Sequence, residues 1–315
     1  MLQILRNFEA FVAYAGSLPL PGRGATLDRW RDFARLAAQD LNLVKLAESH
    51  ADALAILAEC RAPAAKPRSR WAVWSSELPS AQVSAQRRNE FYVLNGLKAW
   101  CAGAPWVTDA LVTCRDNEAQ PLLVHVHMDQ HGVHVDDEPW QGLGLRECGT
   151  RNVHFSNATG VAVGSPGDYL VRPGYWHAAI GVAACWHGAA VAVANRLRKR
   201  CERQADPHTR AHLGAVDVLL SAAAAALRDA AFIIDTEPTR RQQALALRVR
   251  GIVELAAANT IDRVGRALGA APLCLDAEHA QRIADLMLFL RQSHAERDLE
   301  QLSAYSARDH DAWNL

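Results

Sequence analysis

Residues 94–103 read Leu-Asn-Gly-Leu-Lys-Ala-Trp-Cys-Ala-Gly and lie in a region of short apolar runs. Runs rich in aromatic and β-branched residues, bounded by turn residues, are typical of β-strands. Gly, Asn, Asp and Pro separate the runs here, which are 71–74, 91–94, 110–113 and 122–125. Nine of the 19 glycines fall between Gly96 and Gly167, which favours a turn-rich sheet. The sequence therefore predicts a β-domain over residues 69–173.

Helical periodicity flanks this region on both sides. In residues 1–68, Leu27, Trp30 and Phe33 begin a pattern with three- and four-residue spacing, and Thr26 stands where an N-cap is expected. After Pro173 come four long segments rich in Ala and Leu, which are 178–203, 211–235, 240–268 and 277–302. Long helices with short connections favour an antiparallel bundle, predicted here over residues 174–315.

The composition excludes several classes of partner. The chain has 34 basic and 34 acidic residues, so no basic face for nucleic acid or an anionic membrane is indicated. Seven dispersed cysteines without a Cys-x-x-Cys pair are typical of reduced thiols, and no signal peptide is evident. The apolar run 175–195 contains His177 and His187, which favours a buried helix over a membrane span. We expect a soluble cytoplasmic protein. Only four of the basic residues are lysines, which, with the many alanines, suggests a bacterial genome rich in GC.

Common catalytic motifs are absent or incomplete. Gly142-Leu-Gly144 lacks the third glycine of a dinucleotide loop, where Glu147 stands. Four histidines lie close together, namely His125, His127, His131 and His134. The first two would share one face of a strand, as metal ligands or as a polar outer face, but no third ligand is evident. Neither Glu-x-x-His nor Gly-x-Ser-x-Gly occurs.

Several phrases, in order along the chain, resemble the acyl-CoA dehydrogenases. These are Trp74-Ser-Ser-Glu-Leu-Pro79, the stretch 94–103, the stretch from Gly144 to Phe155, Arg266-Ala-Leu-Gly-Ala-Ala271, and the helix beginning at Asp285. The resemblance covers nearly the whole chain from Leu27 onward. It implies an α+β fold that is mostly α, with N-terminal helices, a central β-barrel-like domain and a C-terminal four-helix bundle.

The resemblance also implies a cofactor and partners. FAD would contact residues from three segments, which are Ser75, Ser76, Trp100, Cys101, Ala102, Arg266 and Gly269. The substrate would be an acyl-CoA or a carrier-bound acyl group. An electron-transfer flavoprotein could accept the electrons, and a homodimer or homotetramer would form through the bundle. A flavin needs a flat slot with an aromatic wall, which Trp100 could supply, although a core position for Trp100 remains open.

The chain departs from the family at its catalytic base. The usual glutamate position falls at Ser293, and an alternative position falls near Gly174. Neither residue is a carboxylate. Beside the first position, His294 and Glu296 join Ser293 as catalytic candidates, since the pKa of histidine lies near neutrality. The alternative is that Arg291, His294 and Glu296 only satisfy one another and the helix end.

Three segments differ from the family pattern near the expected cofactor. Ala102 carries no hydroxyl, residues 80–83 read Ser-Ala-Gln-Val where a Gly-rich turn is expected, and residues 205–214 replace an Arg-x-Phe-Gly phrase. Three functional hypotheses therefore stay open. The first is an FAD-dependent oxidoreductase acting on an acyl thioester with a non-standard base. The second is a flavin-dependent monooxygenase on the same fold, and the third is a flavin-free, non-catalytic scaffold.

Overall fold

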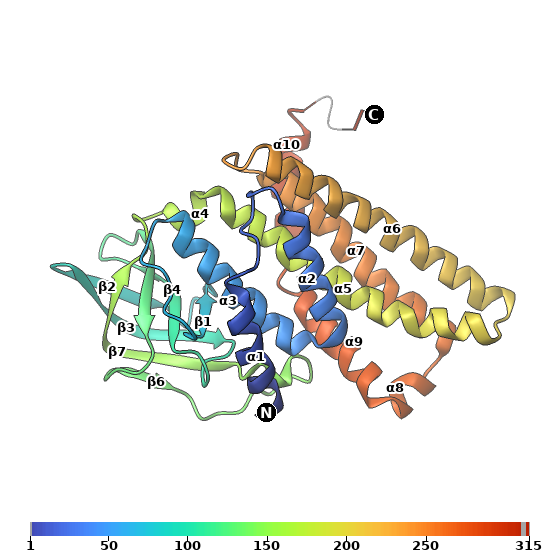
Figure 1. The fold of residues 1–315 in the computed structure, drawn as a ribbon, viewed down its shortest axis with the longest axis horizontal. Coiled ribbons are helices and arrows are strands. Elements are labelled where there is room, and N and C mark those ends of the chain that lie inside the picture. Colours follow the sequence, from blue (N-terminus) through green and yellow to red (C-terminus); the bar gives the residue numbers. More distant parts are fainter. Residues whose placement is uncertain (1, 310–312, 315) are drawn as a thin grey trace. The chain divides into compact units, whose positions relative to one another are not determined.

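The computed structural model describes residues 2–309 and 313–314. The chain divides into two compact units, each built from separated segments. The β-containing unit comprises residues 2–18, 42–142 and 146–175, and the helical unit comprises 19–41, 143–145 and the chain from 176 onward (Figure 1). The sequence-based division at residues 68 and 173 remains a prediction.

The β-containing unit is built on seven strands. They are β1 (Trp71–Trp74), β2 (Val83–Arg88), β3 (Phe91–Cys101), β4 (Asp109–Arg115), β5 (Pro121–His127), β6 (Val133–Val135) and β7 (Arg151–Ala162). The strand order is β1-β4-β2-β3-β7-β5, and β5 also pairs with β4, which closes the sheet on itself. The short β6 pairs with β7. This confirms the predicted β-barrel-like domain.

Three helices and a short turn complete this unit. They are α1 (Leu2–Ala15), α3 (Leu41–Glu59) and the short α4 (Asp168–Val171), with a 3₁₀ turn at Arg146–Cys148. The buried Ile56 and Leu57 of α3 pack against Trp71 and strands β4 and β5. Two side chains of α3 also accept backbone hydrogen bonds from β1, because the N–H groups of Trp71 and Val73 donate to His50 and Ser49. An otherwise open strand edge is thereby satisfied.

Gly96 shows why β3 requires a glycine in its middle. Its φ is +126°, and a Cβ atom there would lie 2.2 Å from the carbonyl oxygen of Gln82. The pairing of β3 with β7 shifts register between Leu94 and Asn95, directly before this residue. The register shifts again between Lys98 and Cys101, so β3 is irregular on both sides of residues 97–98.

The helical unit contains the predicted long helices. Its elements are α2 (Thr26–Gln39), α5 (Pro173–Arg203, from residue 176 onward), α6 (Pro207–Thr236), α7 (Gln243–Leu268), α8 (Ala271–Leu275), α9 (Ala277–Leu290) and α10 (Glu296–Ser306). In Figure 1, α6 and α7 run side by side. The fourth predicted helix, 277–302, is wrong in one respect. It is broken at 291–295, where Ala295 takes a φ of +46° that an α-helix cannot contain.

The first turn of α2 is capped from a distance. Thr26 was expected to be the N-cap, but it is the first helical residue and is fully buried. The carboxylate of Asp235 in α6 accepts hydrogen bonds from the Gly24 N–H, the Thr26 N–H and the Thr26 hydroxyl, at 3.0, 3.0 and 2.6 Å. A side chain 209 residues away therefore accepts the hydrogen bond of the first N–H group of this helix.

Helix α5 is the one described helix whose length and apolar composition would suit a membrane span. Within its most apolar window, 72% of the residues are buried inside the protein. That burial is typical of a core helix.

Candidate functional site

Trp100 is the most unusual residue of the β-containing unit. Its φ is +60°, a left-handed conformation that is a clear outlier for a bulky side chain. It lies in the second irregular stretch of β3, and 57% of its surface is exposed. Its N–H donates to the side-chain oxygen of Asn152 at 3.4 Å. Backbone strain of about 1–3 kcal/mol that persists at an exposed aromatic residue is typical of functional sites.

The residues predicted to meet the cofactor after β1 lie beside this stretch. The Ser76 hydroxyl donates to the Ala99 carbonyl oxygen at 2.5 Å. The indole N–H of Trp74 donates to the Ala102 carbonyl oxygen at 3.1 Å. The structure therefore brings Ser76 to the same edge as Trp100 and Ala102, whereas the Ser75 side chain is hydrogen-bonded to Tyr169 of α4. Cys101 differs from these, because its side chain is completely buried.

Lys98, which is buried in the barrel, connects β3 with β4 and with the end of β1. Its ammonium donates to both the carbonyl and the hydroxyl oxygen of Thr113, each at 2.7 Å. The Thr113 hydroxyl in turn donates to the Trp74 carbonyl oxygen at 3.4 Å. Burial lowers the pKa of Lys98 to about 8. The sequence singled out Lys98 only as part of the stretch 94–103. Its burial could not be predicted, because the residue that contacts its ammonium, Thr113, lies on another strand, β4.

The remaining cofactor candidates belong to the helical unit. Arg266 lies in the last turn of α7 and pairs with Asp262 at 3.6 Å, with both side chains exposed. Gly269 follows the helix with a φ of +69°, and its N–H donates to the Gly265 carbonyl oxygen. Its ψ of −162° lies outside the left-handed helical region, in a conformation that is essentially restricted to glycine. Their predicted contact with a cofactor remains a prediction.

The catalytic candidates lie in the break between α9 and α10. His294 is held by Asp298, which accepts from its backbone N–H at 3.2 Å and lies 3.3 Å from its Nδ1. The Ser293 hydroxyl accepts from the Ala295 N–H, and Glu296 is exposed. Directly before them, the Gln292 carbonyl accepts a hydrogen bond from Arg250 at 3.0 Å. The break is therefore a strained loop that presents an oriented histidine.

The alternative structural explanation for these residues stays open, because Ser293 and His294 both bond residues at the start of α10, although the partners differ from those expected. Arg291 pairs with Glu254 of α7 at 3.1 Å, and His294 takes Asp298 as its partner. The sequence reasoning missed Asp298. Its place four residues after His294 could have suggested the contact, because residues with that spacing are neighbours on a helix.

The carboxylate of Glu59, the last residue of α3, lies beside Gly174, the alternative position of the family's catalytic base. Glu59 accepts a hydrogen bond from the Gly174 N–H at 2.9 Å and pairs with Arg172 at 2.7 Å. A Cβ atom on Gly174 would lie 2.1 Å from Oε2 of Glu59, so this carboxylate fills the space that a side chain at 174 would need. No local sequence signal links residue 59 to residue 174.

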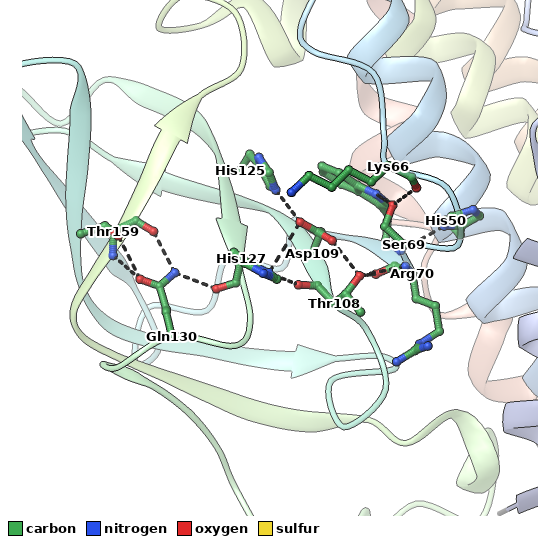
Figure 2. A network of polar contacts seen from close by, with 11 residues as sticks. His50, Lys66, Ser69, Arg70, Thr108, Asp109, His125, His127, Gln130 and Thr159 are labelled. Atoms are coloured by element: carbon green, nitrogen blue, oxygen red, sulfur yellow. Dashed lines mark hydrogen bonds and ion pairs between the residues drawn. The ribbon is translucent and has the colours of Figure 1, made fainter.

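The histidines of β5 form a hydrogen-bonded network with β4. Asp109 lies opposite His127, and it receives a hydrogen bond from His125 at 2.8 Å (Figure 2). His127 bonds the Thr108 carbonyl oxygen at 2.8 Å, and Trp71 stacks on His125 with 4.5 Å between ring centroids. Burial alone would raise the pKa of Asp109, but hydrogen bonds from His125 and Thr108 bring it below its usual value.

Beside this network lies an open groove of about 520 Å³ lined by Phe91, His125, His127, Gln130, Thr159, Gly160 and Val161. Gln130 bridges to the backbone of Thr159 through both ends of its amide. Across the described residues, no group of three or more His, Cys, Asp or Glu side chains is arranged to hold a metal ion. His127, His131 and His134 are exposed, whereas His125 is half-buried against Trp71.

The comparisons with known proteins agree with this architecture. Residues 75–158 match the family model "Acyl-CoA dehydrogenase, middle domain". A search of curated proteins found no match. Among solved structures, the dibenzothiophene monooxygenase TdsC from Paenibacillus sp. A11-2 is 18% identical, with 89% of this chain and 82% of that chain covered and a TM-score of 0.75. TdsC has also been solved with FMN bound.

Two further structures extend the likeness. The structure titled as the electron transferring flavoprotein of Acidaminococcus fermentans is 14% identical, with 97% and 89% coverage and a TM-score of 0.82. The acyl-CoA dehydrogenase from Geobacillus kaustophilus is 14% identical, with 76% and 69% coverage and a TM-score of 0.67. The chain therefore has the acyl-CoA dehydrogenase fold. Residues 75–158, within its β-barrel, match the middle-domain model of that family, so the resemblance found in the sequence is confirmed.

The described residues fit a flavin at the Trp100 edge. An exposed aromatic ring, held in a strained backbone, stands beside the Ser76 hydroxyl and the carbonyl groups of Ala99 and Ala102, and such a surface suits a planar ring system with polar groups along one side. Ala102 cannot donate a side-chain hydrogen bond, so backbone groups and the serines would supply the polar contacts.

Proposed function

We propose that the protein is a flavin-dependent oxidoreductase that binds FAD against Trp100. The single observation that carries this proposal is the strained, exposed conformation of that tryptophan on an irregular strand. Ser75, Ser76, Cys101 and Ala102 would line the same edge. Arg266 and Gly269 of the helical unit complete the proposed set of cofactor residues. FMN is the main alternative cofactor, since FMN-bound TdsC has the same fold.

We propose CH–CH oxidation of an acyl thioester, either acyl-CoA or carrier-bound, as the reaction. A flavin supplies the two-electron oxidant for such chemistry: the α-proton of the substrate goes to a base, and the β-hydrogen leaves as hydride. The protein must therefore hold the thioester, exclude water and provide a proton acceptor. A positioned base typically contributes about 10²–10⁴-fold to the rate.

Two groups are candidates for that acceptor. His294, oriented by Asp298 and flanked by Ser293 and Glu296, is the candidate in the helical unit. Glu59, which fills the space beside Gly174, is the candidate in the β-containing unit. His294→Asn and Glu59→Gln separate them: the variant that removes the base should lose at least about 100-fold in kcat, while flavin content stays unchanged.

A second candidate function is a flavin-dependent monooxygenase. Neither expected base position carries a carboxylate of its own, and the chain shares its fold with a dibenzothiophene monooxygenase. In this case Ser293 and His294 would support the reaction of the reduced flavin with oxygen. NADH with a flavin reductase should then give oxygen-dependent product.

The proposed assembly follows from the same function. A homodimer or homotetramer formed through the helical bundle, located in the cytoplasm, would pass electrons to an electron-transfer flavoprotein. Size-exclusion chromatography with light scattering would test the oligomer. Electron transfer to a purified electron-transfer flavoprotein would test the acceptor.

The visible absorption spectrum of the purified protein is the decisive experiment. A flavin spectrum, present as purified or after soaking with FAD or FMN, supports the proposal. Bleaching by one member of an acyl-thioester panel without oxygen then identifies the dehydrogenase. Trp100→Ala should weaken flavin binding while leaving the fold intact, and Trp140→Ala, outside the candidate site, serves as the matched control. A protein that stays colourless after soaking would instead support the flavin-free scaffold.

A further inference from the structure

Lys98 is a buried cation whose hydrogen-bond partners are neutral. Only 2% of its surface is exposed, and both of its acceptors are oxygens of Thr113. Within the described part of the chain, no ion pair involves Lys98. Lysine is almost never fully buried without a paired charge, because desolvating an ammonium is strongly unfavourable.

The charged and titratable groups around Lys98 do not neutralise it. Glu77, in the segment after β1, pairs with Arg115 of β4 at 2.8 Å, and both side chains are exposed. Two thiols flank the ammonium, from Cys101 on β3 and Cys114 on β4. Burial raises the pKa of the Cys114 thiol to about 12 and that of the Cys101 thiol still further, so both remain uncharged at neutral pH. The barrel therefore holds a net positive charge here.

This charge is joined to both segments of the candidate flavin edge. Lys98 lies two residues before Trp100 on β3. Through Thr113 it is connected to the Trp74 carbonyl oxygen, and Ser75 and Ser76 follow directly. The Ser76 hydroxyl donates to the carbonyl oxygen of Ala99, which lies between Lys98 and Trp100 on β3. The cation thus lies within one hydrogen-bonded circuit with the residues proposed to contact the flavin.

We propose that the ammonium of Lys98 tunes the bound flavin by favouring its reduced, more negatively charged form over its oxidised form. The inference rests on the proposed flavin-binding function and assigns Lys98 as an electrostatic positioning residue for it. A fixed positive charge in a region of low dielectric constant lowers the free energy of negative charge that develops nearby. The side chain itself is buried in the barrel and is not a catalytic residue.

A purely structural role makes a different prediction. If Lys98 only ties β3 to β4, then losing its hydrogen bond to Thr113 should matter and losing its charge should not. Lys98→Gln keeps an N–H donor and removes the charge, whereas Thr113→Val keeps the charge and removes one acceptor. Lys98→Met removes both the charge and the donor. Lys199→Met, at an exposed position of the helical unit, controls for the change in net charge.

The test is the midpoint potential of the flavin in each loaded protein, measured by equilibration with a redox dye. We expect Lys98→Gln and Lys98→Met to shift the potential to more negative values by at least about 30 mV. This equals a tenfold loss of preference for the reduced flavin in a two-electron couple. Thr113→Val and Lys199→Met should remain within about 10 mV of the unmodified protein.

A pH series supplies a second test on the same samples. The difference in potential between the unmodified protein and Lys98→Gln should narrow as the pH rises through about 8, where Lys98 loses its proton. Thermal unfolding of the flavin-free proteins gives a readout independent of the cofactor, and Lys98→Met should raise the midpoint temperature at pH 7.

The outcomes separate this inference from the function on which it rests. Flavin bound at unchanged potential in both Lys98 variants overturns the inference and leaves the proposed function standing. The same result follows if Thr113→Val reproduces the shift, because the hydrogen bond would then be responsible. If the unmodified protein binds neither FAD nor FMN, the proposed function fails, and the inference fails with it.

Discussion

Replacing Lys98 by methionine should stabilise the flavin-free protein at neutral pH. Burial lowers the pKa of Lys98 from 10.5 to about 8, and 1.36 kcal/mol per pH unit converts that shift into about 3 kcal/mol of lost stability. Methionine removes this penalty but leaves both Thr113 oxygens without the ammonium donor, which costs about 1–2 kcal/mol. We therefore expect a net gain of about 1–2 kcal/mol at pH 7.

The pH dependence of the free energy of unfolding tests the direction of this effect. The pKa of Lys98 is lower in the folded state, so the unfolded chain binds more protons between pH 8 and 10.5. The stability of the unmodified protein should therefore rise with pH across this window, by up to about 3 kcal/mol from this group. Lys98→Met lacks that contribution. Its advantage should shrink with pH and change sign at about pH 9.

Urea unfolding at pH 7 and pH 10 measures both quantities, with Thr113→Val as the matched control for the lost hydrogen bond. A Lys98→Met protein that is less stable at pH 7, with the same pH slope as the unmodified protein, would refute the reasoning. Such a result would mean that the ammonium is better solvated or better paired than its contacts indicate.

Three further predictions concern backbone strain and capping. Asp235→Ala should lower stability by about 1–2 kcal/mol, seen as faster amide hydrogen exchange in the first turn of α2, whereas Asp229→Ala should have little effect. Ala295→Gly should raise stability by about 1 kcal/mol in urea unfolding, since glycine adopts a positive φ without strain, and unchanged stability would contradict the strain. Trp100→Gly should raise the thermal midpoint of the flavin-free protein yet weaken flavin binding in fluorescence titrations. A variant that binds flavin normally would remove Trp100 from the site.

The sequence predicted the order of the elements well, because strands and helices leave strong local patterns. The β-texture around residues 94–103 and the apolar periodicity after Pro173 each reflect contacts within one element. The break of the last helix at Ser293–Ala295 was missed, since no proline or glycine marks it. The hydrogen bond from Arg250 to Gln292, a contact across the bundle, fixes its position instead.

The candidate site was predictable only in its local parts. Ser76 and Trp100 were named from short phrases, and the structure places them at one edge. The roles of Lys98 and Glu59 depend on groups at Thr113 and Gly174, which lie 15 and 115 residues away. The left-handed backbone at Trp100 could not be predicted from the sequence either, because a tryptophan in a strand normally indicates an extended conformation.

The dependence of α2 on Asp235 has a consequence for synthesis on the ribosome. At about 5–20 residues per second, the 209 residues that separate Thr26 from Asp235 take roughly 10–40 s to translate. During that interval the Thr26 N–H and hydroxyl lack the carboxylate of Asp235 as their acceptor. The contact between Thr26 and Asp235 can therefore form only after α6 has been synthesised, long after α2 itself.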